Sequence, residues 1–194
     1  MTPIGHSLAG YAIYNFSVAP TNHNRVKLAF LCIFMATAAD LDFLPGIIVG
    51  RPHLYHHTLT HSLVFAFIAS LVIAGIVSIR MKPFSRIFSL CFISYLSHIF
   101  IDFFEFSGHH SHRGGISGGM PLFWPISKEK FFSPIALYLA FHYDRLPSAS
   151  TMEWIKSMLD LYNFSAIVHE VVLILPFILL GQLYRRMCRR DQLT

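Results

Sequence analysis

The stretch Ser94-Tyr-Leu-Ser-His98-Ile-Phe-Ile-Asp102 decides how this chain folds, because it sets an imidazole and a carboxylate four residues apart inside an apolar run. Residues at i and i+4 lie on the same face of an α-helix. One turn before His98 on that face comes Ser94, and Glu105 follows nearly one turn after the carboxylate. Ionisable groups in an apolar helix normally face a bundle interior, a water-filled cavity or a bound ion, so this stripe predicts a functional site. A buried His–Asp pair that only stabilises packing is the alternative.

The composition of the chain is that of a membrane protein. Hydrophobic residues make up 54% of the 194 residues, charged residues only 13%, and the mean hydropathy is +0.53. A span of the hydrocarbon core takes about 20 apolar residues, and several runs approach that length. We therefore expect an all-α polytopic membrane helix bundle in which residues 1–194 form a single domain. No cleavable signal peptide is expected, because the first basic residue is Arg25.

Five helices are expected, with a long polar connection between the fourth and the fifth. Their approximate ranges are Ile4–Val18, Val26–Asp42, Ser62–Ile79, Phe84–Phe106 and Phe164–Tyr184. Leu44-Pro45-Gly46 is interpreted as the stop signal of the second helix. In the long connection, Met120–Ile126 is punctuated by Pro and rich in aromatic residues, which predicts a lid lying on the membrane surface. His109, His110 and His112 in the same connection are more simply a solvated tract.

Carboxylates also stand at the end of the second predicted helix. Asp40 and Asp42 do not share a helix face, but they share a side where the chain extends, so one of them can turn inward as an oxygen ligand. The alternative is that both are solvated at the membrane surface. His6, near the start of the first segment, is by itself more simply an interfacial residue.

A group of histidines precedes the third predicted helix. His57 and His61 have the i,i+4 spacing that lets two imidazoles bind one metal from a single helix face. His56 is five residues from His61, which suits ligation across a turn that leads into the helix. The spacing leaves open which of His56 and His57 is the ligand.

The basic residues predict the orientation of the chain. The Arg80–Arg86 turn, the Arg185–Arg190 tail, and Arg25 with Lys27 are expected on the cytoplasmic side, since basic residues of short loops lie there. The N-terminus then lies outside and the C-terminus inside. Counted from the turn at about 1.5 Å per residue, the His98–Asp102 pair lies roughly 18–24 Å from the inner surface. This depth matches the outer ends of the other helices, so the polar residues are expected to converge near the outer face.

Taken together, these residues resemble the inner-membrane metal-dependent hydrolases that are described as LexA-binding. The pieces that carry the resemblance are Gly5-His6, Asp40-Leu41-Asp42, His56 with Thr60-His61-Ser62, Tyr95-Leu96-Ser97-His98 with Asp102, and Gly119-Met-Pro-Leu-Phe-Trp-Pro125. Two positions depart from the family pattern: His57 stands where Arg is usual, and Ala39 stands where Pro is usual. The resemblance implies a protein of the bacterial inner membrane, metal-dependent hydrolysis and, by resemblance alone, a regulator protein as partner. Direct nucleic-acid binding is not expected.

The order of the polar residues is also similar to that in zinc-dependent phospholipase C. The ligands of that family run His, Asp, His and then His-x-x-x-Asp. The corresponding residues here are His6, Asp42, His56, His98 and Asp102. This weaker resemblance implies a multinuclear site for phosphate esters.

Imidazole and carboxylate ligands without thiolate suit zinc, with manganese or iron as alternatives. The predicted metal ligands are His6, Asp42, His56, His57, His61, His98 and Asp102, and Asp40 or Glu170 is the expected general base. The leading hypothesis is hydrolysis of a lipid or lipid-linked phosphoester at the outer membrane–water interface. The alternative is a non-catalytic membrane protein, either a metal carrier or a scaffold that binds a regulator.

Overall fold

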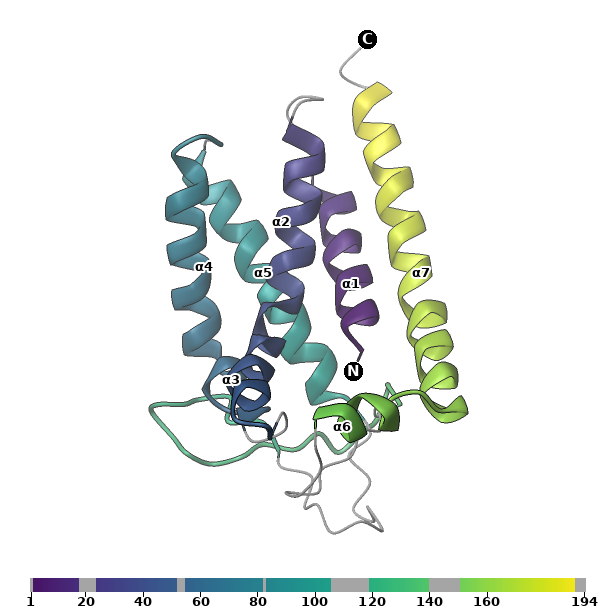
Figure 1. Cartoon of the computed structure of the whole chain (residues 1–194). Helices are drawn as coiled ribbons and strands as arrows, with labels where there is room; N and C mark the ends of the chain where they lie inside the picture. Colours follow the sequence, from purple (N-terminus) through teal and green to yellow (C-terminus); the bar gives the residue numbers. More distant parts are fainter. Residues whose placement is uncertain are drawn as a thin grey trace.

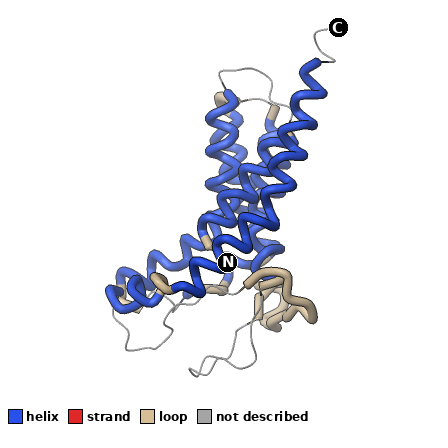
Figure 2. Tube along the Cα trace, turned by 90° about the vertical axis from the view of Figure 1, so that its right-hand side faces the viewer, coloured by secondary structure: helices blue, strands red, loops and turns tan. Residues whose placement is uncertain are grey.

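The chain folds as a bundle of helices (Figure 1). The computed structural model describes residues 2–17, 24–51, 55–81, 83–105, 119–139 and 151–190. Within these ranges the long helices are α1 (Pro3–Phe16), α2 (Arg25–Thr37), α4 (Leu63–Ser78), α5 (Phe84–Phe103) and α7 (Leu161–Arg190). Two short helices, α3 (Phe43–Ile48) and α6 (Thr151–Ser157), lie at the end of the bundle where the N-terminus lies. Figure 2 shows from the side that the long helices run along one another and that no described residue forms a strand. The predicted all-α membrane bundle is confirmed.

Three helical stretches are long and apolar enough to cross a membrane. They are Arg25–Ile48, Phe84–Phe103 and Leu161–Cys188, whereas α4 is a shorter apolar helix of 16 residues and α1 has 14. Large apolar side chains such as Phe30 and Val172 are more than half exposed on the outside of the bundle, as expected of a surface that meets lipid. By length and composition, then, three of the five expected crossings are present in the described part of the chain.

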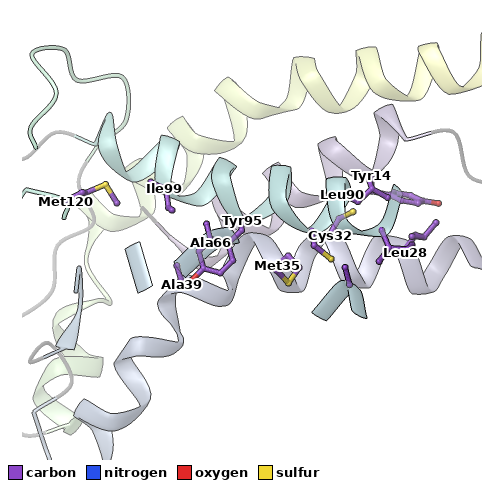
Figure 3. Close-up of a cluster of buried hydrophobic side chains, with 13 residues drawn as sticks. Tyr14, Leu28, Cys32, Met35, Ala39, Ala66, Leu90, Tyr95, Ile99 and Met120 are labelled. Atoms are coloured by element: carbon purple, nitrogen blue, oxygen red, sulfur yellow. The ribbon is translucent and has the colours of Figure 1, made fainter. Parts of the chain in front are cut away.

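The packing of α1 against its neighbours fixes the position of His6, which this helix carries. α1 lies between α2 and α7, and α5 packs against α1, α2 and α4. A Cβ atom on Gly10 would lie 2.5 Å from the carbonyl oxygen of Cys32 and 2.8 Å from Cα of Ile33, so α1 and α2 approach closely only because this residue is glycine. Figure 3 shows the buried apolar core of the bundle, in which Tyr95 and Met35 are fully buried.

The second predicted helix has a different ending from the one expected. α2 stops at Thr37, the chain tightens into a 3₁₀ helix over Ala38–Asp42, and α3 follows at once. The predicted extension at the two aspartates is therefore wrong. The predicted stop at Leu44-Pro45-Gly46 is wrong as well, because Pro45 lies in the first turn of α3. Backbone N–H groups in the first turn of a helix have no intrahelical acceptor, so a proline is tolerated there.

The histidines before α4 do not lie on a helix face. Ser62 is the N-cap of α4, and its hydroxyl accepts a hydrogen bond from the backbone N–H of Phe65 at 3.1 Å. The residues before it are therefore outside the helix. His61 lies in a 3₁₀ turn, and His57 has φ 55° in the left-handed region, which is uncommon for a residue other than glycine; strained backbone of this kind clusters at functional sites. The predicted shared helix face of His57 and His61 is wrong, although a turn still brings the two rings together.

The segment 119–139 crosses the end of the bundle. Met120 is buried in the core and pairs with Phe131, and Leu122 accepts a hydrogen bond from the N–H of Leu63 at 2.9 Å. Ile126 is 85% exposed. The first half of the predicted lid is therefore packed into the bundle and only its second half is exposed, whereas its place on the membrane surface stays a prediction. The histidines His53, His109, His110 and His112 lie outside the described residues.

More of the described basic residues lie at one end of the bundle than at the other. The turn between α4 and α5, the start of α2 and the C-terminal end of α7 lie at one end, and the N-terminus lies with α3 at the other (Figure 1). The basic residues at the first end are Arg25, Lys27, Arg80, Arg86, Arg185 and Arg186, whereas the segments at the other end carry Arg51, Lys128, Lys130 and Lys156.

Candidate metal centre

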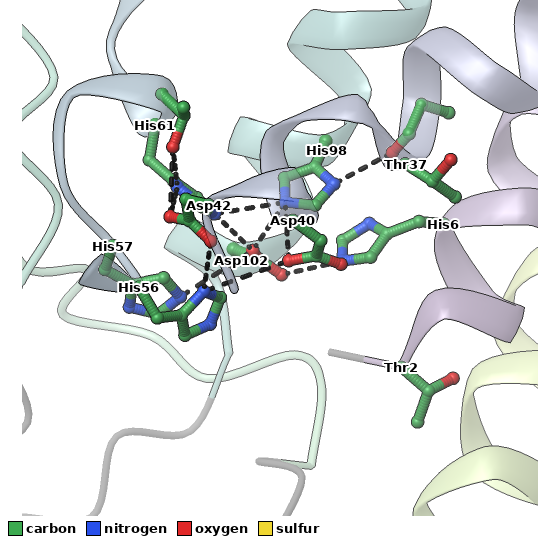
Figure 4. Close-up of polar contacts among 12 residues, drawn as sticks. Thr2, His6, Thr37, Asp40, Asp42, His56, His57, His61, His98 and Asp102 are labelled. Atoms are coloured by element: carbon green, nitrogen blue, oxygen red, sulfur yellow. Dashed lines mark hydrogen bonds and ion pairs between the residues drawn. The ribbon is translucent and has the colours of Figure 1, made fainter. Parts of the chain in front are cut away.

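Imidazoles and carboxylates from four parts of the chain meet at the end of the bundle where α3 lies (Figure 4). α1 contributes one imidazole, the 3₁₀ helix after α2 two carboxylates, the turn before α4 three imidazoles, and α5 one of each. These residues, called the His–Asp cluster below, are His6, Asp40, Asp42, His56, His57, His61, His98 and Asp102. All of them were singled out from the sequence, and the structure brings them together.

Asp102 is the carboxylate at the middle of the cluster. Its Oδ2 atom lies 3.1 Å from Nε2 of His98, 3.6 Å from Nε2 of His61 and 3.8 Å from Nε2 of His57. Its Oδ1 atom lies 3.1 Å from Nε2 of His6. The side chain is 1% exposed, so the charge of this carboxylate is compensated by the surrounding rings or by an ion rather than by water.

The backbone fixes the tautomer of His98. Its Nδ1 atom lies 2.8 Å from the carbonyl oxygen of Ala36, which can only accept, so Nδ1 carries the proton and donates it. The lone pair of Nε2 then points into the cluster. A ligand histidine is typically held in this way, with one ring nitrogen donating to an oxygen atom while the other faces the metal.

His61 is held by side chains instead. Its Nδ1 atom lies 3.1 Å from Oγ1 of Thr60 and 3.3 Å from Oδ2 of Asp42, and the Thr60 hydroxyl itself donates to that same carboxylate at 3.0 Å. The threonine oxygen and the carboxylate thus both accept from Nδ1–H. Nε2 of His61 consequently faces Nε2 of His98, at 3.2 Å.

Two imidazole nitrogens at this distance need a proton or a cation between them. Burial lowers the pKa of His61, but the carboxylates of Asp102 and Asp42 outweigh burial and raise it to about 9. At neutral pH without metal, this ring therefore carries the positive charge that the carboxylates require. A divalent ion bound between the rings would replace that proton.

His56 and His57 both reach the cluster, on different sides. Nδ1 of His56 lies 3.1 Å from Oδ1 of Asp42, and the two histidine rings lie 4.1 Å apart between centroids. Burial lowers the pKa of both imidazoles, of His57 well below its usual value, so both are neutral and able to act as ligands at pH 7. Among the described residues, Nε2 of His57 is buried without a hydrogen-bond partner. The lone pair of such a nitrogen is available to a cation.

Asp40 is the carboxylate of the cluster that solvent can reach. Its side chain is 16% exposed, against 3% for Asp42 and 1% for Asp102. Oδ1 of Asp40 lies 3.5 Å from Nε2 of His98 and 4.0 Å from Nδ1 of His56.

The donor set fits a divalent metal ion. Three overlapping groups have ligand atoms that all lie within 4.8 Å of one another, namely His56, His57 and His61; Asp40, His61, His98 and Asp102; and Asp40, Asp42 and His56. The groups contain nitrogen and oxygen donors and no thiolate, a combination that suits zinc and also admits manganese or iron.

Glu170 lies away from these contacts. Its Oε1 atom accepts from the backbone N–H of Thr2 at 2.9 Å, and its Oε2 atom accepts from the hydroxyl of the same threonine. In Figure 4, Thr2 stands apart from the cluster. The carboxylate that the sequence offered as a general base is thus placed as an anchor for the start of α1.

Two groups at the cluster were not predicted. Thr60 orients both His61 and Asp42, and its position next to a histidine in a Thr-His-Ser sequence was a usable signal. The carbonyl of Ala36 carries no sequence signal, because every residue has a carbonyl group.

Comparison with known proteins agrees with a membrane location. No curated protein and no solved structure matches the chain. The family described as YdjM inner membrane protein matches residues 1–187, which is nearly the whole chain. With its apolar helices and its buried polar cluster, the chain belongs to the YdjM inner membrane protein family.

Proposed function

We propose that this protein is a metal-dependent hydrolase that acts on a lipid or lipid-linked phosphoester. The observation that carries the proposal is the pair of buried imidazoles, His61 and His98, whose Nε2 atoms converge at 3.2 Å while an oxygen atom holds each Nδ1. With each Nδ1 donating to an oxygen atom, both Nε2 atoms turn toward one point beside the carboxylate of Asp102, where a metal ion would take the place of the His61 proton.

In this proposal His61, His98 and Asp102 hold a zinc ion. Three protein ligands with an open fourth position are typical of catalytic zinc sites, whereas structural sites are closed by four. His6 faces the second oxygen of Asp102 and stacks on the ring of His98 at 3.7 Å between centroids, which keeps both ligands in place. A divalent ion in such a site supplies a Lewis acid that activates water and polarises a phosphoryl or carbonyl oxygen.

Asp40 is the proposed general base. It is the most exposed of the three carboxylates and lies 3.5 Å from Nε2 of His98, so it borders the open side of the ligand set. From there its carboxylate can take a proton from an attacking water. Asp42, His56 and His57 form the wall next to it, and the overlap of the groups provides ligands for a second ion.

The proposed location of the site is the outer face of the inner membrane. The basic residues of the short α4–α5 turn, the start of α2 and the end of α7 lie at the opposite end of the bundle, and basic residues of short loops stay in the cytoplasm. A substrate at this level is one whose ester group lies at the membrane–water boundary.

The test separates ligand from base. The experiment compares wild type with Asp102→Asn and Asp40→Asn, and the exposed residue Glu129 provides the control variant Glu129→Gln. Bound zinc, manganese and iron are measured in each purified protein. Hydrolysis of a phospholipid and of a soluble aryl phosphodiester is measured on the same samples. Asp102→Asn is expected to lose metal and hydrolysis together. Asp40→Asn is expected to keep metal and to lose about 10²-fold or more in rate, which is the usual contribution of a general base.

Two results would contradict the proposal. Equal metal content in wild type and Asp102→Asn would remove Asp102 from the ligand set. Stoichiometric metal in a wild type that hydrolyses neither substrate would favour the metal carrier, and a metal-free wild type would favour a scaffold.

A further inference from the structure

A long apolar cavity opens beside the His–Asp cluster, between α2 and α4. Its volume is about 610 Å³. Along α4 it is lined by Phe65, Ala69 and Ile73, which follow one another at i,i+4 spacing and so form one stripe of that helix. At about 1.5 Å per residue, this stripe runs for about 12 Å along the bundle.

The cavity has one polar end. Asp42 and Thr60 line it together with the apolar residues, and both belong to the contacts of the cluster. Away from this end the walls are side chains of α2 and α4, such as Phe34 and Met35. The cavity thus joins the carboxylate end of the cluster to the hydrocarbon depth of the bundle.

The rim of the cavity is apolar and exposed. Phe34 is 47% exposed, Leu41 48% and Leu59 40%. α2 is part of a candidate membrane span, and an apolar opening beside such a span is expected to face the lipid tails rather than water. A soluble ligand would have to cross lipid to enter from this side, whereas an acyl chain enters by sliding sideways between the two helices.

We infer that the cavity holds one acyl chain of a membrane phospholipid, whose ester-bearing end lies at Asp42 and Thr60. The shape favours a single extended chain, because α4 contributes a single stripe of side chains to the lining, with Phe34 and Met35 of α2 and Tyr95 of α5 as the other walls at this depth. The polar end suits the headgroup side, since a cation held by the cluster would attract a phosphate. The role of the cavity as the substrate site rests on the proposed function, but its occupation by lipid does not.

Two tryptophan substitutions on neighbouring residues of α4 test the inference. Ala69→Trp places a large ring in the middle of the cavity. Ile68→Trp is the matched control, because Ile68 is 52% exposed on the outside of the same helix turn and does not line the cavity. Ala69→Phe is a milder filling variant, to be used if the tryptophan protein does not fold.

Native mass spectrometry of the metal-free proteins in detergent gives a readout that does not depend on activity. Wild type and Ile68→Trp are expected to retain about one phospholipid per chain, and Ala69→Trp or Ala69→Phe is expected to lose most of it. Equal lipid retention by the filled and control variants would overturn the inference, and so would a wild type that retains no phospholipid.

Hydrolysis by the metal-loaded proteins gives the second readout. Filling the cavity is expected to lower turnover of a long-chain phospholipid at least tenfold relative to Ile68→Trp and to leave turnover of a soluble aryl phosphodiester within twofold. Ile73→Trp, which fills only the far end, is expected to shift preference toward shorter acyl chains. Equal loss of both activities would overturn the inference. If wild type retains phospholipid but hydrolyses neither substrate, the cavity is a lipid site and the proposed hydrolase function is rejected.

Discussion

His61 and His98 come from segments 37 residues apart, and their Nε2 atoms face each other at 3.2 Å. Neither ring can rotate away without losing a hydrogen bond, because Nδ1 of His98 donates to the carbonyl of Ala36 and Nδ1 of His61 contacts Thr60. The point between the two rings is therefore a fixed position for a cation, and the rest of the cluster is arranged around it.

Metal affinity is expected to rise with pH. The carboxylates raise the pKa of His61 to about 9, above its usual value of about 6.5, so the metal-free protein holds a proton where the ion would bind. Binding below pH 9 must release this proton, and apparent zinc affinity should fall about tenfold for each pH unit from about 9 to 6.5. The measurement is competition with a chelator at several pH values. An affinity that is flat over this window would show that His61 is not displaced.

The same proton should stabilise the metal-free protein. A group whose pKa is higher in the folded state contributes its full stability below the unfolded pKa and loses it as pH rises through the folded value. The His61 contribution is thus present below about pH 6.5 and lost toward pH 9. Thermal unfolding of metal-free protein should show this loss, and His61→Gln should flatten it. If the unfolding temperatures of metal-free wild type and His61→Gln depended on pH in the same way, the assignment of this proton to His61 would be contradicted.

Thr60→Val is expected to weaken metal binding without unfolding the protein. The substitution keeps the shape but removes the hydroxyl that contacts Nδ1 of His61 and donates to Asp42. Loss of such an orienting partner typically costs 10- to 100-fold in affinity. Thr37→Val is the control, since the Thr37 hydroxyl donates to backbone carbonyls within its own helix. Equal affinity in the two variants would show that Thr60 does not orient the ligands.

Glu170 is expected to matter for stability rather than for chemistry. Gln at this position can still accept from the N–H of Thr2 and bond its hydroxyl, so Glu170→Gln should keep hydrolysis within a few-fold of wild type. Glu170→Ala leaves these buried donors unpaired and should cost about 1–3 kcal/mol of stability. Rates and unfolding curves of both variants provide the check. A loss of 10²-fold in Glu170→Gln with normal stability would restore its role as general base.

The orientation of the bundle is tested by labelling with a membrane-impermeant thiol reagent in intact cells. In a background without Cys188, Arg51→Cys should be labelled and Arg80→Cys should not, because these positions lie at opposite ends of the bundle. Both positions react after the cells are permeabilised, which serves as the control. The reverse pattern would place the site on the cytoplasmic side.

The sequence predicted the parts of the cluster that depend on regular geometry. His98 and Asp102 share a face because α5 is a continuous helix, and that spacing was enough to find them. The same reasoning from i,i+4 spacing failed for His57 and His61, because these two residues lie before the N-cap Ser62 rather than on an α-helix. Ser62 is a residue type that starts helices, so this boundary was within reach of sequence reasoning.

Other features depend on contacts between distant segments. The 3₁₀ helix that turns both aspartates toward the histidines forms where α2 meets α5, and periodicity does not report such a tightening. The cavity is a space between α2 and α4, and its volume depends on how the two helices approach each other. Neither the 3₁₀ helix nor the volume of the cavity can be predicted from a local sequence pattern.

The contact between Thr2 and Glu170 joins residues 168 positions apart. A chain that enters the membrane from its N-terminus makes α1 first and α7 last, so this contact forms only when synthesis is almost complete. His6 lies one turn after Thr2, on the helix end that the contact anchors. A product truncated before α7 therefore lacks one of the anchors of the helix that carries His6.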